Sequence, residues 1–159
     1  MLVEDDPDDE ELFRLALAHA NVDCRVEVVS NGEALLGRLF GSGAHGTSDK
    51  KPDPDLILLD LKLPKLSGLQ VLRVLKNTAH GTEAVTCPIV VFTSSDDEKD
   101  IATSYGLGAL SYVRKPVSHG RFMETVQETV LYWLNINEPV PRHGSRAAMP
   151  DIEHAVGGI

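Results

Sequence analysis

LILLDLKLP, residues 56–64, is the stretch that decides the fold of this chain of 159 residues. Its four leading apolar residues are too few for a buried helix. Pro52 and Pro54 precede this apolar run and Pro64 follows it, so the run is predicted to be a strand buried on both faces. Such strands belong to parallel sheets that helices cover on both sides. Asp60 ends the strand, where open α/β sheets bind their ligands, although aspartate is also common at the start of a turn.

Length and composition predict a single globular domain. The hydrophobic content is 42% and the charged content 25%, both ordinary for such a domain. No apolar run is long enough to span a bilayer, and no secretory signal is visible at the N-terminus, so we expect no membrane partner and a cytoplasmic location. The net charge of −9 argues against nucleic-acid binding, which needs a basic surface. Cys24 and Cys87 stand alone and are interpreted as reduced core cysteines, and the histidines form no zinc-ligand pair.

The rest of the chain alternates between strand and helix patterns. Further strands are predicted at Met1–Glu4, Arg25–Val29, Pro88–Phe92 and Leu110–Val113. Helices are predicted from Pro7, Asn31, Gly68, Asp96 and Ser118, the last one to Asn135. Five strand–helix repeats of this kind indicate an α/β fold, a doubly wound five-stranded parallel sheet with helices on both faces.

Two helices carry more detailed predictions. The first helix is predicted to be capped by Asp6 and to turn Leu12, Leu15, Ala16 and His19 toward the core. The second is predicted to be capped by Asn31 and to turn Ala34, Leu35 and Leu39 inward. Residues 41–54 read as an inserted loop. Residues 1–135 are predicted to be the folded domain and residues 136–159, rich in proline and glycine, an extended or disordered tail.

Parallel strands end at the same edge of a sheet, and this topology gathers Glu4, Asp5, Asp60, Thr93 and Lys115. Clustered carboxylates repel one another unless a cation joins them, and an all-oxygen ligand set favours Mg²⁺. An aspartate can act as a nucleophile toward phosphorus, and a lysine and a hydroxyl can then contact the phosphoryl oxygens.

Each of these residues also has a simpler interpretation. The acidic run can serve the dipole of the following helix, Thr93 can cap a helix, and Lys115 can be a surface lysine. The joint placement of all of them at strand ends favours a functional site.

Four motifs in order resemble the receiver domain of two-component response regulators. They are LVEDDP (2–7), LILLDLKLP (56–64), VVFTSS (90–95) and GALSYVRKP (108–116). The resemblance covers roughly residues 1–135. It implies a flavodoxin-like receiver fold with strand order 2-1-3-4-5.

The resemblance also implies the parts of a site. Asp60 would be the phosphoacceptor, and Mg²⁺ would be held by Glu4, Asp5, Asp60 and the backbone carbonyl of Lys62. Glu4 stands where an aspartate is commoner. Lys62 is a cation where many relatives carry a neutral residue, so an altered lifetime of the phosphoryl group is predicted.

The same resemblance makes Thr93 and Tyr112 a switch pair and Lys115 the cation that contacts the phosphoryl group. After phosphorylation Thr93 would move toward the phosphoryl group and Tyr112 would turn inward. The Lys115–Pro116 bond is expected to be cis, as is usual in this family.

A narrower set of features is similar to the single-domain regulators that are paired with phytochrome-type histidine kinases. These features are the Val-Glu-Asp start, the Thr-Ser-Ser after the fourth strand, Ser104-Tyr105 and Tyr132-Trp133-Leu134. This resemblance implies a histidine kinase as partner, of the phytochrome type. It also implies a homodimer formed through the fourth helix, fifth strand and fifth helix. Phe122 and Trp133 are candidate residues for an output contact on this surface, although core packing is favoured for Phe122.

The expected function is that of a stand-alone response regulator that signals through this surface. Its own chemistry would be limited to weak self-phosphorylation and autodephosphorylation. One alternative is a Mg²⁺-dependent phosphohydrolase, but such enzymes place a second acid two residues after the nucleophile, where this chain has Lys62. A receiver that serves only as a phosphate sink, accepting phosphoryl groups without switching an output, also fits the sequence. A flavodoxin-like electron carrier is disfavoured because Glu-Asp-Asp-Pro replaces a phosphate-binding loop.

Overall fold

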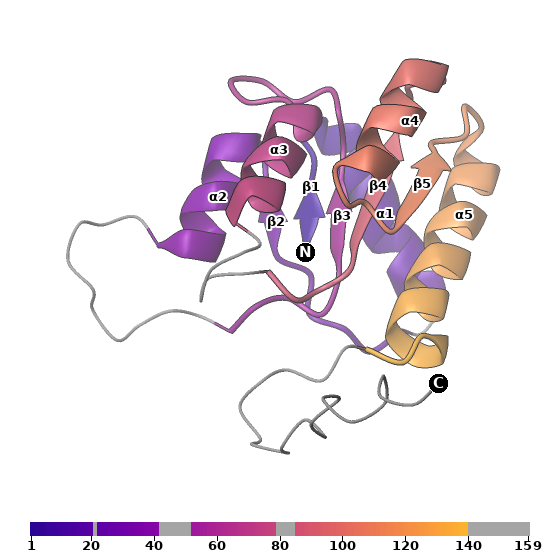
Figure 1. The fold of residues 1–159 in the computed structure, drawn as a ribbon. Helices are drawn as coiled ribbons and strands as arrows, with labels where there is room; N and C mark the ends of the chain where they lie inside the picture. Colours follow the sequence, from indigo (N-terminus) through magenta and orange to yellow (C-terminus); the bar gives the residue numbers. More distant parts are fainter. Residues whose placement is uncertain (21, 42–51, 79–84, 140–159) are drawn as a thin grey trace, which may run out of the picture.

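The computed structural model describes residues 1–20, 22–41, 52–78 and 85–139 and contains a parallel five-stranded sheet with helices on both faces (Figure 1). The strand order β2-β1-β3-β4-β5 confirms the predicted fold. The strands are β1 (Leu2–Val3), β2 (Val28–Val29), β3 (Ile57–Leu59), β4 (Ile89–Thr93) and β5 (Ser111–Arg114).

Within the described residues, five α-helices connect or follow the strands. They are α1 (Pro7–His19), α2 (Gly32–Phe40), α3 (Gly68–Thr78), α4 (Glu98–Gly106) and α5 (His119–Leu131), and α5 continues into a π-helical turn, η1 (Tyr132–Ile136). The predicted caps are confirmed, since Asp6 accepts a hydrogen bond from the Asp8 N–H and Asn31 accepts one from the Ala34 N–H. Helix α3 begins at a glycine for a steric reason: a Cβ on Gly68 would lie 2.3 Å from the Asp60 carbonyl oxygen.

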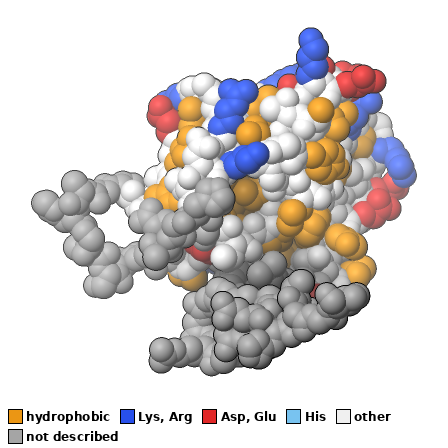
Figure 2. All heavy atoms as spheres, in the orientation of Figure 1, with side chains coloured by type: hydrophobic (Ala, Val, Ile, Leu, Met, Phe, Trp, Pro, Cys, Tyr) orange, Lys and Arg blue, Asp and Glu red, His pale blue; other side chains and the backbone are white. Residues whose placement is uncertain are grey.

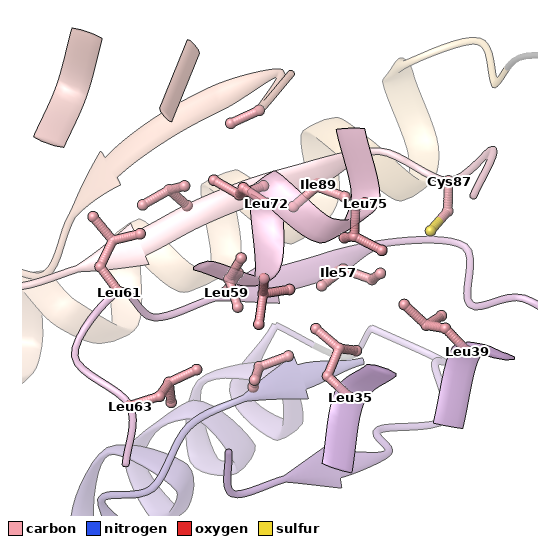
Figure 3. Close-up of a cluster of buried hydrophobic side chains, with 14 residues drawn as sticks. Leu35, Leu39, Ile57, Leu59, Leu61, Leu63, Leu72, Leu75, Cys87 and Ile89 are labelled. Carbon is pink, nitrogen blue, oxygen red and sulfur yellow. The ribbon is translucent and has the colours of Figure 1, made fainter. Parts of the chain in front are cut away.

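The core consists of two hydrophobic clusters, one on each face of the sheet. The first joins β3 to α2 and α3 through Leu35, Ile57, Leu59 and Leu72 (Figure 3). The second joins the sheet to α1 and α5 and contains Leu58, Phe92, Phe122 and Phe13 among others. Because successive side chains of a strand point to opposite faces, β3 supplies both clusters, and this explains its unbroken apolar run.

The inward face of α1 differs from the prediction. Phe13, Ala16 and Leu17 are buried, whereas Leu15 is 43% exposed. The helix carries two apolar stripes, and the one with the aromatic ring faces the sheet because it buries more area. His19 is likewise exposed, as is Ala34 in α2, where only Leu35 and Leu39 of the predicted face are buried.

The structure also tests the predicted strand lengths, the burial of two aromatic residues and one peptide bond. The first two strands have only two residues each, so Arg25–Glu27 precede β2. Phe122 is buried as expected, and Trp133 is partly buried against the second cluster. No peptide bond among the described residues is cis, so the expected cis Lys115–Pro116 bond is wrong. The trans form is the intrinsically preferred one, and Lys115 reaches its partners without the cis form.

Some predictions fall on residues that the structure does not describe. They include most of the inserted loop at 41–54 and the tail beyond residue 139. The domain boundary at residue 135 therefore stays a prediction. Within the described ranges, none of the helices has the length and apolar character that crossing a bilayer requires.

Candidate functional site

Asp60 follows the central strand of the sheet, and its carboxylate is held from two directions. Its backbone N–H donates to the Val3 carbonyl at 3.1 Å, which aligns the end of β3 with the end of β1. Oδ1 accepts hydrogen bonds from the Thr93 hydroxyl at 2.6 Å and from the Lys62 backbone N–H at 3.0 Å. The residue is 5% exposed. Its side chain is thus presented in one fixed orientation at the carboxyl edge of the sheet.

Lys115 follows β5 and places its ammonium among three carboxylates. Nζ donates to Asp60 Oδ2 at 2.6 Å, to Glu4 Oε2 at 2.5 Å and to Asp9 Oδ2 at 2.8 Å. The Lys115 backbone N–H donates to the Thr93 carbonyl at 2.8 Å, which positions the residue beside β4. An ammonium has three donors, and here all three are used.

Electrostatics favour an ionised Asp60. Burial alone would raise its pKa, but the hydrogen bond and charge of Lys115, together with the bonds from Thr93 and the Lys62 N–H, keep the pKa of Asp60 below its ordinary value. Burial raises the pKa of Glu4, and the bond to Lys115 offsets only part of this effect. The pKa of Lys115 is raised, because its bonds to the carboxylates outweigh burial. At neutral pH the site therefore presents an ionised carboxylate next to a cation.

The oxygen atoms at this edge are of the chemical type that a hard divalent cation prefers. Glu4 and Asp60 are buried, their oxygens share one ammonium, and the exposed Asp5 follows Glu4 directly. Carboxylate oxygens are the ligands that Mg²⁺ and Mn²⁺ favour. In the part of the chain that the structure describes, no three acidic, histidine or cysteine side chains are grouped closely enough to ligate a metal. The predicted ligand set, with the Lys62 carbonyl, therefore stays a prediction.

The predicted switch residues Thr93 and Tyr112 are connected through Ser95. The Tyr112 hydroxyl donates to the Ser95 carbonyl at 3.1 Å, and the Ser95 N–H donates to Thr93 Oγ1 at 3.4 Å. The Ser95 hydroxyl in turn donates to Asp100 in α4 at 2.6 Å. Burial raises the pKa of Tyr112. A hydrogen-bonded path thus runs from Asp60 to both α4 and β5; it is buried between Asp60 and Ser95 and partly buried at its two ends.

Sequence reasoning missed two residues of the site. Ser95 lies in the Thr-Ser-Ser motif, and its position two residues after the strand-end hydroxyl of Thr93 is the signal that points to it. Asp9 lies in an acidic first turn, where aspartates favour the helix dipole whether or not they contact a site. The sequence pattern cannot distinguish Asp9 from Asp8 as the partner of Lys115. The rotation of α1 about its axis decides which of the two aspartates faces the lysine.

At the outer side of the site lies a second lysine. The Lys62 ammonium donates to the Ser94 hydroxyl at 3.1 Å, and both residues are exposed. The loop after β3 thus holds an exposed cation on the residue two positions after Asp60.

A comparison with protein families agrees with this geometry. Residues 1–127 match the model of the response regulator receiver domain. Response regulator Rcp1 from Synechocystis is 33% identical over 134 residues, which cover 84% of this chain and 87% of Rcp1. The probable methanogenesis regulatory protein FilR2 from Methanothrix harundinacea is also 33% identical, over 86% of this chain and 84% of FilR2.

Solved structures show the same similarity. The crystal structure of the Mn²⁺-bound form of Rcp1 superposes with a TM-score of 0.76 at 31% identity and covers 88% of this chain and 96% of Rcp1. The phosphorylated cyanobacterial phytochrome response regulator RcpA gives a TM-score of 0.75 at 33% identity and covers 87% of this chain and 94% of RcpA.

Proposed function

This chain belongs to the family of response regulator receiver domains, and from that premise we propose that it accepts a phosphoryl group on Asp60 from a histidine kinase. The observation that carries the proposal is the fixation of both carboxylate oxygens: Thr93 donates to one and Lys115 to the other. These two donors are placed to contact phosphoryl oxygens once a phosphoryl group is bound. The proposed role is that of a cytoplasmic response regulator.

The proposed chemistry is a direct displacement at phosphorus. An Asp60 carboxylate oxygen forms the new P–O bond while the P–N bond to the kinase histidine breaks, and the imidazole nitrogen keeps the electron pair. Asp60 needs no general base because its lowered pKa leaves it ionised at neutral pH. Lys115 and Thr93 stabilise the charge on the phosphoryl oxygens, and catalysis of this kind rests on positioning and charge.

A divalent cation completes the proposal. Glu4, Asp5, Asp60 and the Lys62 carbonyl would hold Mg²⁺, which would neutralise charge on the transferring group. The carboxylate donor set and the Mn²⁺ in the Rcp1 structure support a divalent metal here. The preference for Mg²⁺ rests on the hardness of the ligands.

The proposed output surface consists of α4, β5 and α5. Tyr105 of α4 is 50% exposed and Leu110, just before β5, is 60% exposed. Figure 2 shows hydrophobic side chains among polar ones over the side that carries α4 and α5. The Thr93–Ser95–Tyr112 path leads from Asp60 to this side, which supports a switched contact with a partner protein or a second copy of the chain. Identical Thr93 and Tyr112 positions with and without a phosphoryl mimic would contradict the coupling.

The proposed partner is a histidine kinase of the phytochrome type. The 33% sequence identity to the phytochrome response regulator RcpA supports this choice. FilR2, a probable methanogenesis regulatory protein, is equally identical in sequence, so identity alone does not select the kinase. Phosphoryl transfer from a phosphorylated phytochrome kinase should be faster than transfer from an unrelated kinase under the same conditions. Equal rates would remove the phytochrome assignment and leave the receiver function intact.

The decisive test is labelling with a small phosphodonor, acetyl phosphate, in the presence of Mg²⁺. The wild-type chain should gain one phosphoryl group by intact mass, and Asp60→Asn should gain none. Label that persists on Asp60→Asn would refute the assignment of the phosphoacceptor. The wild type could also become labelled without any change in its oligomeric state or partner binding. That result would instead indicate a receiver that serves only as a phosphate sink.

A further inference from the structure

Asp9 contacts the site, but it is neither the proposed phosphoacceptor, nor a proposed metal ligand, nor a proposed switch residue. It lies in the first turn of α1, and its carboxylate accepts a hydrogen bond from Lys115 Nζ at 2.8 Å. Its side chain is 27% exposed, whereas those of Glu4 and Asp60 are 3% and 6% exposed. Asp9 therefore contacts the buried lysine from the solvent side of the site.

The three bonds of Lys115 have different fates during phosphorylation. The ammonium has no donor to spare, so a bond to a phosphoryl oxygen must replace an existing one. The bond to Asp60 is directly affected, because that carboxylate becomes an acyl phosphate. The bond to Glu4 is affected as well, because a divalent cation would share the Glu4 oxygens. Only the bond to Asp9 involves a residue without a part in either event.

The first turn of α1 is built to keep Asp9 in place. Asp6 caps the helix, and Pro7 occupies its first position with a preset φ. The neighbouring Asp8 is exposed, and its side chain makes no hydrogen bond or ion pair with the described residues. Two adjacent aspartates in one helical turn thus differ in their environment: Asp9 is partly buried and contacts Lys115, whereas Asp8 is exposed and does not.

We propose that Asp9 is a positioning residue, which keeps the Lys115 ammonium at the phosphorylation site while its bonds to Glu4 and Asp60 are exchanged. This inference rests on the proposed function of Asp60. It adds a third carboxylate partner that stays with the lysine when the other two are engaged.

The test compares Asp9→Asn with Asp8→Asn, which removes the same charge from the same helical turn. Phosphorylation by acetyl phosphate with Mg²⁺ should be about fivefold slower in Asp9→Asn, because a partly exposed charge-assisted hydrogen bond is lost. The rate of Asp8→Asn should stay within about twofold of wild type, since an exposed charge acts weakly through water. Asp9→Glu should recover part of the rate. Equal rates in Asp9→Asn and Asp8→Asn would overturn the proposal.

A second measurement needs no phosphoryl transfer. Without Asp9, Lys115 has only Glu4 and Asp60 as partners and should compete harder with a cation for their oxygens. Binding of Mn²⁺, followed by electron paramagnetic resonance, should be about threefold weaker in Asp9→Asn than in Asp8→Asn. Equal Mn²⁺ affinity of the two variants would contradict the role of Asp9. Failure of the wild type to become labelled would instead refute the proposed function, while the Mn²⁺ comparison would still test Asp9.

Discussion

The site has a buried floor and an exposed rim, and the two are built from the same kinds of residues. The floor consists of Glu4, Asp60, Thr93 and Lys115, whose side chains are almost fully buried. The rim consists of Asp5, Asp9, Lys62 and Ser94, all partly or fully exposed. Each region contains acids, a lysine and a hydroxyl. Water screens charges and competes for hydrogen bonds in the rim but is excluded from the floor, so matched substitutions should differ greatly between the two regions.

The largest difference is expected between the two lysines. Lys115→Met would leave the buried Glu4 and Asp60 carboxylates without a cation and should lower the free energy of unfolding by about 3 kcal/mol. Lys62→Met removes an exposed ammonium and should change it by no more than about 0.5 kcal/mol. Urea denaturation at pH 7 without divalent metal measures both. Similar losses of unfolding free energy in the two variants would contradict the expected difference between floor and rim.

The two hydroxyls should show the next largest difference. Thr93→Val keeps the shape of the side chain but removes the 2.6 Å hydrogen bond to Asp60, and it should cost about 2 kcal/mol of stability. Ser94→Ala removes only the exposed bond to Lys62 and should cost less than about 0.5 kcal/mol. Thermal denaturation of both variants compares them. A loss in Ser94→Ala as large as that in Thr93→Val would contradict the expectation.

A smaller effect of defined sign is expected from Glu4. Burial raises the pKa of Glu4 above 4.5, so its contribution to stability is fully present below that pH and is lost as the pH rises through the raised value. Asp60 acts in the opposite direction, since its lowered pKa adds stability that is lost as the pH falls below 3.8 toward the lowered value.

The Glu4→Gln variant should therefore lose the decline in stability above pH 4.5 and keep the decline toward acid. Urea denaturation of the metal-free protein over a pH series tests this. A Glu4→Gln variant with the same decline above pH 4.5 as the wild type would show that Glu4 is not the group responsible.

The smallest expected effect concerns the lifetime of the phosphoryl group. Lys62→Asn removes the exposed cation that stands two residues after Asp60 and contacts Ser94, and hydrolysis of the acyl phosphate should become about threefold faster because water reaches the site more freely. Ser94→Ala, which only loosens Lys62, should show a weaker change in the same direction. Decay of the phosphorylated protein after removal of the phosphodonor measures both. Unchanged decay in Lys62→Asn would show that Lys62 has no influence on the lifetime.

The fold was predictable because its signals are local. The unbroken apolar run before Asp60 indicated a doubly covered parallel strand, and Asp6 and Asn31 indicated where two helices begin. The inward face of α1 was not predictable in the same way. Leu15 competes there with Phe13 and Leu17 for the buried side of the helix, and only packing against the sheet and α5 selects between them.

The floor of the site could be predicted from the sequence, as could Asp5 and Lys62 of the rim, whereas the contact of Asp9 could not. Glu4, Asp60 and Lys115 each follow a strand and Thr93 ends one, and parallel strands end at one edge, so strand order along the chain was enough to gather them. The contacts of Asp9 and of Ser95 depend on the rotation of α1 and on the path of the loop between β4 and α4. Those features arise only when side chains of distant segments pack together, because helix rotation is set by burial and not by local propensity.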